Sequence, residues 1–235
     1  MPTFTSKIFL CMSKSSFSSV SIARKFLMAL TGLFLLIFLL QHFIINFLSV
    51  ISADAFNAVS HFMGYNPIIQ FIMQPILIFA VVFHFVMAFI LETKNKSARS
   101  VKYVVNGSSA NASWMSKNMI YSGLCILLFI GLHFYDFWIP EISHKYVHAS
   151  PENPTRYFGE LQHKLADPIH VIIYCVAFIF LALHLMHGFQ SAFQSVGFRH
   201  NRYTPVIKKL GDLYAVFIPA GFIAIAIFHY VSQLK

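Results

Sequence analysis

The sequence predicts an all-α integral membrane protein, a bundle of five transmembrane helices whose N-terminus is cytoplasmic. Of the 235 residues, 57% are hydrophobic and 11% are charged, whereas a soluble domain carries about 25% charged residues. Five apolar segments are each long enough to cross the hydrocarbon core of a bilayer, which takes about 20 helical residues. Lys and Arg are also divided unequally between the connections, as they are in membrane proteins of fixed orientation.

The elements are expected in a simple order. Residues 1–23 form a basic, Ser-rich cytoplasmic arm, and residues 24–235 form the membrane domain, without an evident internal repeat. The spans are expected at Lys25–Val50, Ile68–Leu91, Asn118–Ile139, Pro168–Phe189 and Leu213–Val231. The small residues at 52–55 resemble a signal-peptide cleavage site, but the first apolar run far exceeds the roughly 7–15 residues of a signal core, which favours a span.

The charges determine the expected orientation. Thirteen of the seventeen Lys and Arg residues lie in the arm, the second connection or the fourth connection, which are therefore expected on the cytoplasmic side. They are Lys7, Lys14, Arg24, Lys25, Lys94, Lys96, Arg99, Lys102, Lys117, Arg199, Arg202, Lys208 and Lys209. This topology accounts for the net charge of +9 without a nucleic-acid partner. The three cysteines have no spacing typical of a zinc site or a disulfide framework.

Each of the first four spans contains a histidine. A polar side chain inside a membrane is energetically costly, so it usually has a function. These are His42, His84, His133 and His184. At 1.5 Å per helical residue, His42 and His133 should lie about 25 Å from the cytoplasmic face. His84 and His184 should lie only about 9–12 Å from it. The histidines therefore fall into two levels of two, the outer level drawn from the first and third spans and the inner level from the second and fourth.

This pairing predicts two haem-binding sites, because a haem iron takes two axial ligands on opposite faces of its ring. A single histidine would more often be hydrogen-bonded within the bundle, and a set of buried histidines can also form the proton relay of a transporter. Neither alternative explains the two levels. His187 follows His184 by one turn, and His170 and His229 lie near span ends, where water should reach them.

Haem propionates are anions, and several cations lie at the inner level. The candidates for charge-assisted bonds to the inner haem are Arg24, Lys25, Lys94 and Arg99. The positive-inside rule alone explains each of them equally well.

Short stretches along nearly the whole chain from Arg24 resemble those of one known family. They are Met28-Ala29-Leu30-Thr31-Gly32, Gln41-His42 with Asn46, Ala53-Asp54-Ala55-Phe56-Asn57, Phe83-His84, Ala98-Arg99, His133, the run from His184 to Gln194 and Tyr203-Thr204-Pro205. The chain thereby resembles the cytochrome b membrane-anchor subunit of bacterial succinate:quinone oxidoreductases, the single-chain, five-helix type with two haems b. The run from His184 to Gln194 is the most specific of these stretches.

The resemblance implies an outer haem held by His42 and His133 and an inner haem held by His84 and His184. The family's fourth-span ligand lies four residues before a glycine, which here is Gly188 and selects His184. His187 then becomes a contact of a propionate or of the ligand. The depths counted along the spans give the same two pairs.

The resemblance also implies partners and a location. A flavoprotein and an iron–sulfur protein would bind at the cytoplasmic face of the bacterial inner membrane and pass electrons from succinate through the haems to a quinone, expected to be menaquinone. The complex would serve the respiratory chain and the tricarboxylic acid cycle, or reduce fumarate in reverse. This chain has neither a dinucleotide fingerprint nor a cysteine cluster of its own. A related alternative is the cytochrome b anchor of a hydrogenase or formate dehydrogenase.

Quinone reduction consumes protons, so a quinone site needs protonatable groups near a haem edge. If electrons pass through both haems, the site lies near the outer one. The candidates there are Asp54, Asp136, Glu141, Asp167 and His170. Each can also be an ordinary interfacial group, and an inner site near Ser21 and Arg24 remains an alternative.

Overall fold

The computed structural model describes residues 4–97 and 118–234, with side chains from Ile22 onward. All regular structure within these ranges is helical. The α-helices are α1 (Phe4–Ile51), α2 (Ala53–Tyr65), α3 (Gln74–Ser97), α6 (Met119–His133), α7 (Ile139–Ile142), α8 (Arg156–Lys164), α9 (Pro168–Ser195) and α10 (Thr204–Ser232). Three short π-helical segments are η1 (Ile69–Met73), η2 (Phe134–Trp138) and η3 (Ser143–Val147).

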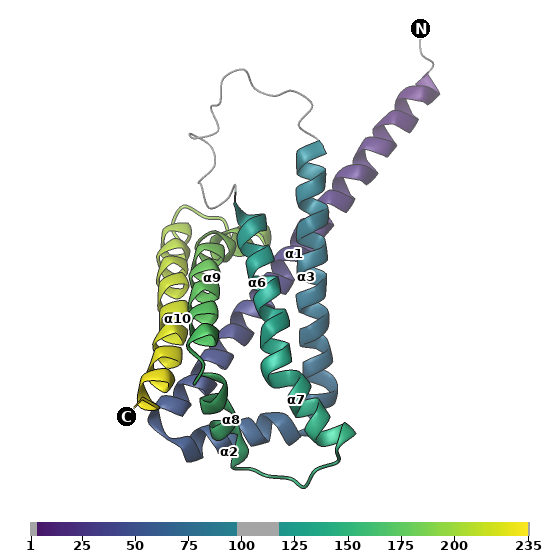
Figure 1. Ribbon diagram of the computed structural model, residues 1–235. Coiled ribbons are helices and arrows are strands. Elements are labelled where there is room, and N and C mark those ends of the chain that lie inside the picture. Colours follow the sequence, from purple (N-terminus) through teal and green to yellow (C-terminus); the bar gives the residue numbers. More distant parts are fainter. Residues whose placement is uncertain (1–3, 98–117, 235) are drawn as a thin grey trace.

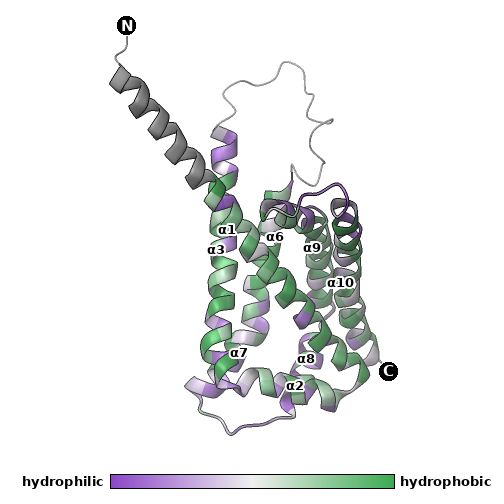
Figure 2. Ribbon diagram, turned by 180° about the vertical axis from the view of Figure 1, so that it is seen from behind, coloured by the Kyte–Doolittle hydropathy of each residue, from purple (hydrophilic) through white to green (hydrophobic). Residues whose placement is uncertain are grey.

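The five expected spans are confirmed. They run over Ile22–Ile51, Ile69–Ser97, Met119–Val147, Pro168–Ser195 and Thr204–Ser232. Hydrophobic residues fill the middle of the long helices, and hydrophilic residues gather toward the two ends of the bundle (Figure 2). Ile37, Phe79 and Leu128, for example, are 66–70% exposed, as side chains facing lipid would be. The chain is therefore a multi-pass membrane protein.

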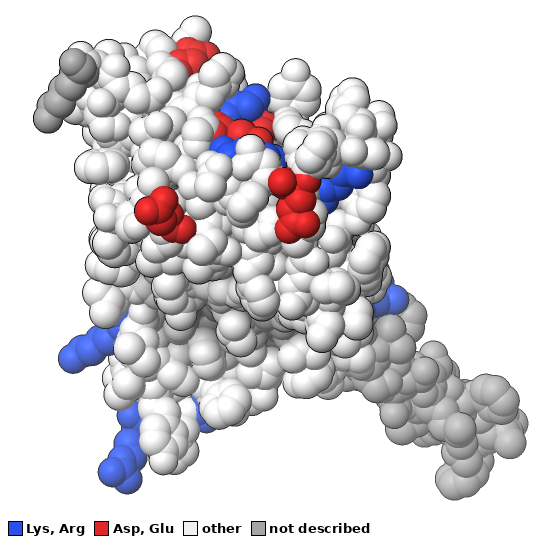
Figure 3. All heavy atoms as spheres, turned by 90° about the horizontal axis from the view of Figure 1, so that it is seen from below, with Lys and Arg blue, Asp and Glu red and all other residues white. Residues whose placement is uncertain are grey.

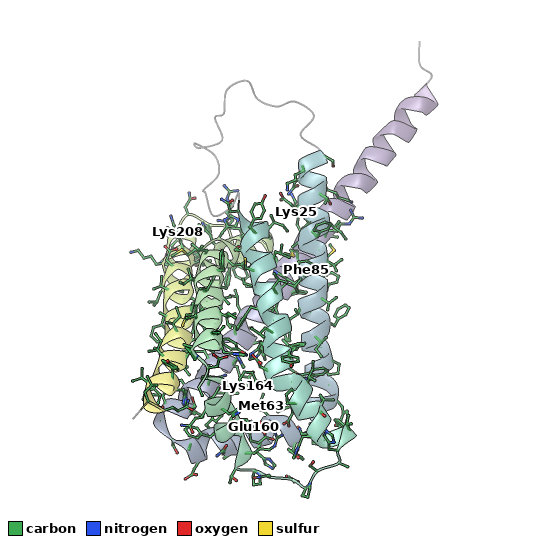
Figure 4. The ribbon with its side chains drawn as sticks, viewed as in Figure 1. Lys25, Met63, Phe85, Glu160, Lys164 and Lys208 are labelled. Carbon is green, nitrogen blue, oxygen red and sulfur yellow. The ribbon has the colours of Figure 1, made fainter. Side chains whose placement is uncertain are left out.

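The two ends of the bundle differ in composition. The basic end carries Lys25 and Lys208, whereas Met63, Glu160 and Lys164 lie at the other end, called here the acidic end (Figure 4). Six of the eight acidic residues belong to the acidic end by their place in the chain: Asp54, Asp136, Glu141, Glu152, Glu160 and Asp167. Helix α1 begins at Phe4, so helix extends through most of the segment expected to be a separate arm.

Helix α9 is central to the packing. It packs most extensively against α10 and also contacts α6 and α1. Helix α1 crosses the bundle diagonally behind the other spans (Figure 1) and contacts α3 as well. A core of Phe43, Tyr174, Phe178, Ile218 and neighbouring residues joins α1, α9 and α10.

Two short helices, α2 and α8, lie across the acidic end (Figure 1). The Ser52 hydroxyl caps α2 by accepting a hydrogen bond from the Ala55 N–H at 3.2 Å, which satisfies an otherwise free donor of the first turn. Helices α2 and α8 pack together, and the Phe158 N–H donates to the Asn57 side chain at 2.8 Å. Neither helix was expected from the hydropathy of the sequence.

Two of the π-helical segments come immediately before prolines. η1 ends two residues before Pro75, and η2 ends two residues before Pro140. A proline lacks an N–H and its ring collides with the carbonyl four residues earlier, here in Phe71 and Asp136. A widened turn relieves that collision, and the helix continues beyond it.

Candidate cofactor sites

The structure brings His42 of α1 and His133 of α6 together. Their ring centroids are 5.7 Å apart, with the rings edge to face. Phe38 stacks on His42 at 5.5 Å, and Phe129 stacks on His133 at 5.9 Å. The two histidines expected at the outer level are therefore neighbours inside an aromatic environment.

The ring nitrogens of this outer pair have few good partners. The Asn46 amide nitrogen lies 3.4 Å from both nitrogens of His42, while it donates to the His42 carbonyl at 2.8 Å. The Nδ1 atom of His133 is buried without a hydrogen-bond partner. Buried polar atoms without partners are uncommon because they lose their hydration without compensation, but His229 Nδ1 shares this feature. What distinguishes the outer pair is that two histidines lie side by side.

The inner pair, His84 of α3 and His184 of α9, has a different environment. The two side chains are close enough to interact electrostatically. The Thr31 hydroxyl of α1 lies 3.3 Å from His84 Nδ1, and the Ser122 hydroxyl of α6 lies 3.3 Å from His184 Nδ1. Each hydroxyl thus contacts the same nitrogen of its histidine.

A glycine follows each of these hydroxyl residues. A methyl group at Gly32 would lie 3.4 Å from His84 Cε1, and one at Gly123 would lie 3.5 Å from His184 Cε1. The two stretches form a short internal repeat that the sequence analysis missed. They are Met28-Ala29-Leu30-Thr31-Gly32, ten residues before His42, and Met119-Ile120-Tyr121-Ser122-Gly123, ten residues before His133. The spacing of Gly32 to His42 and of Gly123 to His133 could have revealed it.

The residues present fit a haem at each level. His42 of α1 and His184 of α9 are each only partly covered by protein atoms, so neither residue is closed off from a bound group. A porphyrin supplies the equatorial nitrogens, so two imidazoles complete the iron's coordination. Across the described ranges, no cluster of three or more His, Cys, Asp or Glu side chains forms a site for a bare metal ion.

The expected propionate contacts are only partly described. Arg24 is half-buried, and Lys25 and Lys94 are exposed at the basic end. His187 is partly buried and interacts electrostatically with His184. Arg99 and the side chain of Ser21 lie outside the described residues.

At the acidic end, the carboxylate of Asp136 is completely buried. It accepts a hydrogen bond from the Tyr174 hydroxyl at 2.9 Å and lies 3.3 Å from Lys164 Nζ and 3.5 Å from His170 Nε2. Tyr174 also contacts the ring of His133, with centroids 6.3 Å apart. Asp136 therefore connects the outer histidine pair to a group of protonatable side chains.

This group continues to the surface. His170 Nδ1 lies 2.8 Å from the Asp167 carboxylate, which also caps α9 by accepting from the Ile169 N–H. The hydrogen bond from His170, followed by that from the backbone, lowers the pKa of Asp167. Asp136, His170 and Asp167 thus form a continuous polar path from the interior to water, which we call the acidic path.

An open pocket of about 400 Å³ lies beside the buried end of this path. Its lining consists of Asp136, Pro140, Arg156, Gly159, Glu160, His163 and Lys164. Seen from this end, acidic and basic atoms gather side by side (Figure 3). The pocket could therefore admit a polar or anionic group next to Asp136.

The remaining quinone-site candidates have other environments. Glu141 forms ion pairs with Lys145 and Arg156, and Arg156 also binds Glu160 at 2.6 Å. Burial raises the pKa of Tyr157 to about 12, so this hydroxyl stays protonated near Glu141. Asp54 is exposed in the first turn of α2. Of the five candidates, the structure brings together Asp136, Asp167 and His170.

The expectation that water reaches His229 is wrong. His229 is fully buried, and its Nε2 lies 2.8 Å from the Ser49 hydroxyl of α1. Phe158 of α8 covers it, with ring centroids 5.6 Å apart. The error follows from the unexpected helix α8, which closes this end of α10.

Comparison of the chain with protein-family models, with curated proteins and with solved structures found no match. The two histidine pairs and the acidic path are therefore the features on which a function can be proposed.

Proposed function

We propose that this chain is the membrane-anchor cytochrome b subunit of a succinate:quinone oxidoreductase in a bacterial inner membrane. One observation carries the proposal: the membrane interior contains two pairs of histidines, His42 with His133 and His84 with His184. Two haems b held by these pairs would supply one-electron transfer between the two faces of the bilayer. The family-like stretches of the sequence, above all the run from His184 to Gln194, specify the kind of complex.

The division of charge supports the orientation in this proposal. The basic end faces the cytoplasm, because Lys and Arg accumulate in cytoplasmic loops. A flavoprotein and an iron–sulfur subunit bind there, and the exposed side chains of Lys25, Lys94 and Lys208 belong to the binding surface. The chain itself carries electron transfer and quinone chemistry and leaves succinate oxidation, or fumarate reduction in reverse, to those partners.

The acidic path supports a quinone site at the outer level. Asp136 lies next to Tyr174, which contacts His133, and it leads through His170 to the exposed Asp167. In the proposal these groups deliver protons from the outer aqueous phase to a reduced quinone, expected to be menaquinone. Lys164, 3.3 Å from Asp136, stabilises the carboxylate between proton transfers.

A proton-coupled transporter is the second candidate, and the acidic path is the observation that favours it. It accounts for Asp136 and His170 but gives no role to the histidine pairs. A cytochrome b anchor of a hydrogenase or formate dehydrogenase would use those pairs in the same way and differ in its soluble partners.

Purification of the full chain tests the proposal directly. We expect reducible visible bands of haem b and a ratio of about two haems per chain. A His229→Gln variant is the matched control, because His229 is buried in the bundle but bonded to Ser49. It should retain both haems.

Co-purification then separates the candidates. With a tag on this chain, we expect a flavoprotein and an iron–sulfur protein to be recovered together with succinate–quinone activity. A chain free of haem would contradict any cytochrome, and a haem-containing complex active with hydrogen or formate would contradict the succinate assignment.

A further inference from the structure

The contact between Thr31 and His84 determines which ring nitrogen carries hydrogen. Thr31 Oγ1 lies 2.9 Å from the Met28 carbonyl oxygen and 3.3 Å from His84 Nδ1. Thr31 Oγ1 also lies 3.1 Å from the Leu27 carbonyl oxygen, so the backbone offers the hydroxyl hydrogen two acceptors, as is usual for a threonine inside a helix. With its hydrogen on the backbone, the hydroxyl oxygen is left to accept from the ring, an arrangement in which His84 Nδ1 is the donor.

The second inner histidine repeats this arrangement. Ser122 Oγ lies 3.0 Å from the Met119 carbonyl oxygen and 3.3 Å from His184 Nδ1. By the same reasoning, His184 Nδ1 carries the hydrogen. A neutral imidazole has one N–H, so Nε2 of both inner histidines keeps its lone pair.

We propose that Thr31 and Ser122 are positioning residues for the inner haem, each fixing the tautomer and orientation of one axial histidine. This inference rests on the proposed function of the histidine pairs. A histidine that binds a metal usually donates its other N–H to an oxygen acceptor, which makes the metal-binding nitrogen more basic. A hydroxyl on the facing helix provides that acceptor on both sides of the inner site.

The outer pair lacks this feature, which makes the inference specific to one site. The ring nitrogens of His42 lie beside the Asn46 amide nitrogen, a donor, and His133 Nδ1 has no partner. Removal of the Thr31 and Ser122 hydroxyls should therefore change the inner haem and leave the outer one unaffected.

Four variants of the full chain in its haem-containing form test this. Thr31→Val and Ser122→Ala remove the hydroxyl with little change in shape, whereas Thr31→Ser and Ser122→Thr retain it as matched controls. In the first two, we expect a higher reduction potential and an altered electron paramagnetic resonance signal of the inner haem, because a less basic Nε2 stabilises ferric iron less. Dissociation of the inner haem should accelerate on the order of tenfold. The outer haem and both controls should behave as wild type.

Nitrogen-15 spectra of the histidine-labelled full chain before haem addition measure the tautomers independently. We expect Nδ1–H at His84 and His184, and a change of about fivefold in the tautomer ratio of His184 in Ser122→Ala, the factor for one ordinary hydrogen bond. If haem binds but the variants leave the inner potential and the tautomers unchanged, the positioning role is overturned. If the tautomers are as expected but the chain never binds haem, the proposed function is wrong. In that case Thr31 and Ser122 only form hydrogen bonds with the two histidines.

Discussion

The histidines of the spans differ in what their ring nitrogens contact. The hydroxyls of Thr31 and Ser122 lie beside Nδ1 of the inner pair, and His229 is bonded to Ser49. His42 and His133 stack against aromatic rings. His229 shows what a histidine that only joins two helices looks like here: it is fully buried and bonded to the facing helix. The four paired histidines are only partly buried.

Single replacements of the paired histidines should remove one haem each. His42→Ala or His133→Ala should lower the haem content from about two to about one per chain and spare the inner haem, because each change removes one of the two axial ligands of the outer haem alone. His84→Ala or His184→Ala should do the reverse. Haem extraction with optical spectra measures this. The control His187→Asn should keep both haems; loss of a haem there, with retention in His184→Ala, would reverse the choice of ligand.

Replacement of Asp136 should slow quinone reduction without loss of haem. Asp136→Asn removes the protonatable group at the buried end of the acidic path, and positioned proton transfer typically contributes about 100-fold or more to a rate. Succinate–quinone turnover and haem content are measured together. Asp54→Asn, which changes an exposed carboxylate, is the control. Unchanged turnover in Asp136→Asn and also in Glu141→Gln would rule out the outer site described here.

At the scale of elements, close packing between α1 and α10 depends on one glycine. A Cβ atom at Gly221 would lie 2.3 Å from a ring carbon of Phe43, so either the ring or the helix would have to move. Gly221→Ala should destabilise the protein by about 1–3 kcal/mol, the usual cost of overpacking. Thermal unfolding in detergent measures the change.

Gly131 provides the matched control, because a Cβ there meets nothing within 4 Å. Gly131→Ala should be neutral or slightly stabilising, since alanine favours helix by up to about 1 kcal/mol over glycine. Equal effects of the two replacements would show that helix propensity, rather than the contact with Phe43, determines the result.

Hydropathy predicted which elements cross the membrane but not where they end. The third span was expected to end at Ile139, yet helix continues to Val147 through Glu141 and Lys145. Glu141 and Lys145 form an ion pair one helical turn apart. The helix therefore continues through charged residues at which a search for apolar segments places its end. Helix α2 carries a recognisable start signal in Ser52, but it is too polar for a search based on apolar length to detect.

At the scale of the whole molecule, the orientation is a testable prediction. The iron–sulfur subunit should crosslink to the connections at residues 94–117 and 199–209, because these carry most of the basic residues. Mass spectrometry of the crosslinked complex measures this. Crosslinks to residues 145–164 instead would place the soluble subunits at the acidic end and reverse the proposed orientation.

The pairing of the histidines could be predicted from the sequence because it depends only on depth, which follows from counting residues along each span. The contacts of Thr31 and Ser122 could not, because they depend on the rotation of each helix about its axis. The same rotation, together with α8, buries His229. The haems, the quinone and the soluble partners remain predictions.

The packing of α10 also has a consequence for how the protein is made. Helix α10 is the most buried of the five spans and presents Gly221 and His229 to Phe43 and Ser49 of α1. On a ribosome, the outer histidine pair is complete once α6 has been translated, and the inner pair once α9 has followed. Helix α10 emerges after both. The first span must therefore stay in the lipid with the Phe43 side of α1 uncovered until the fifth span is inserted and closes the bundle.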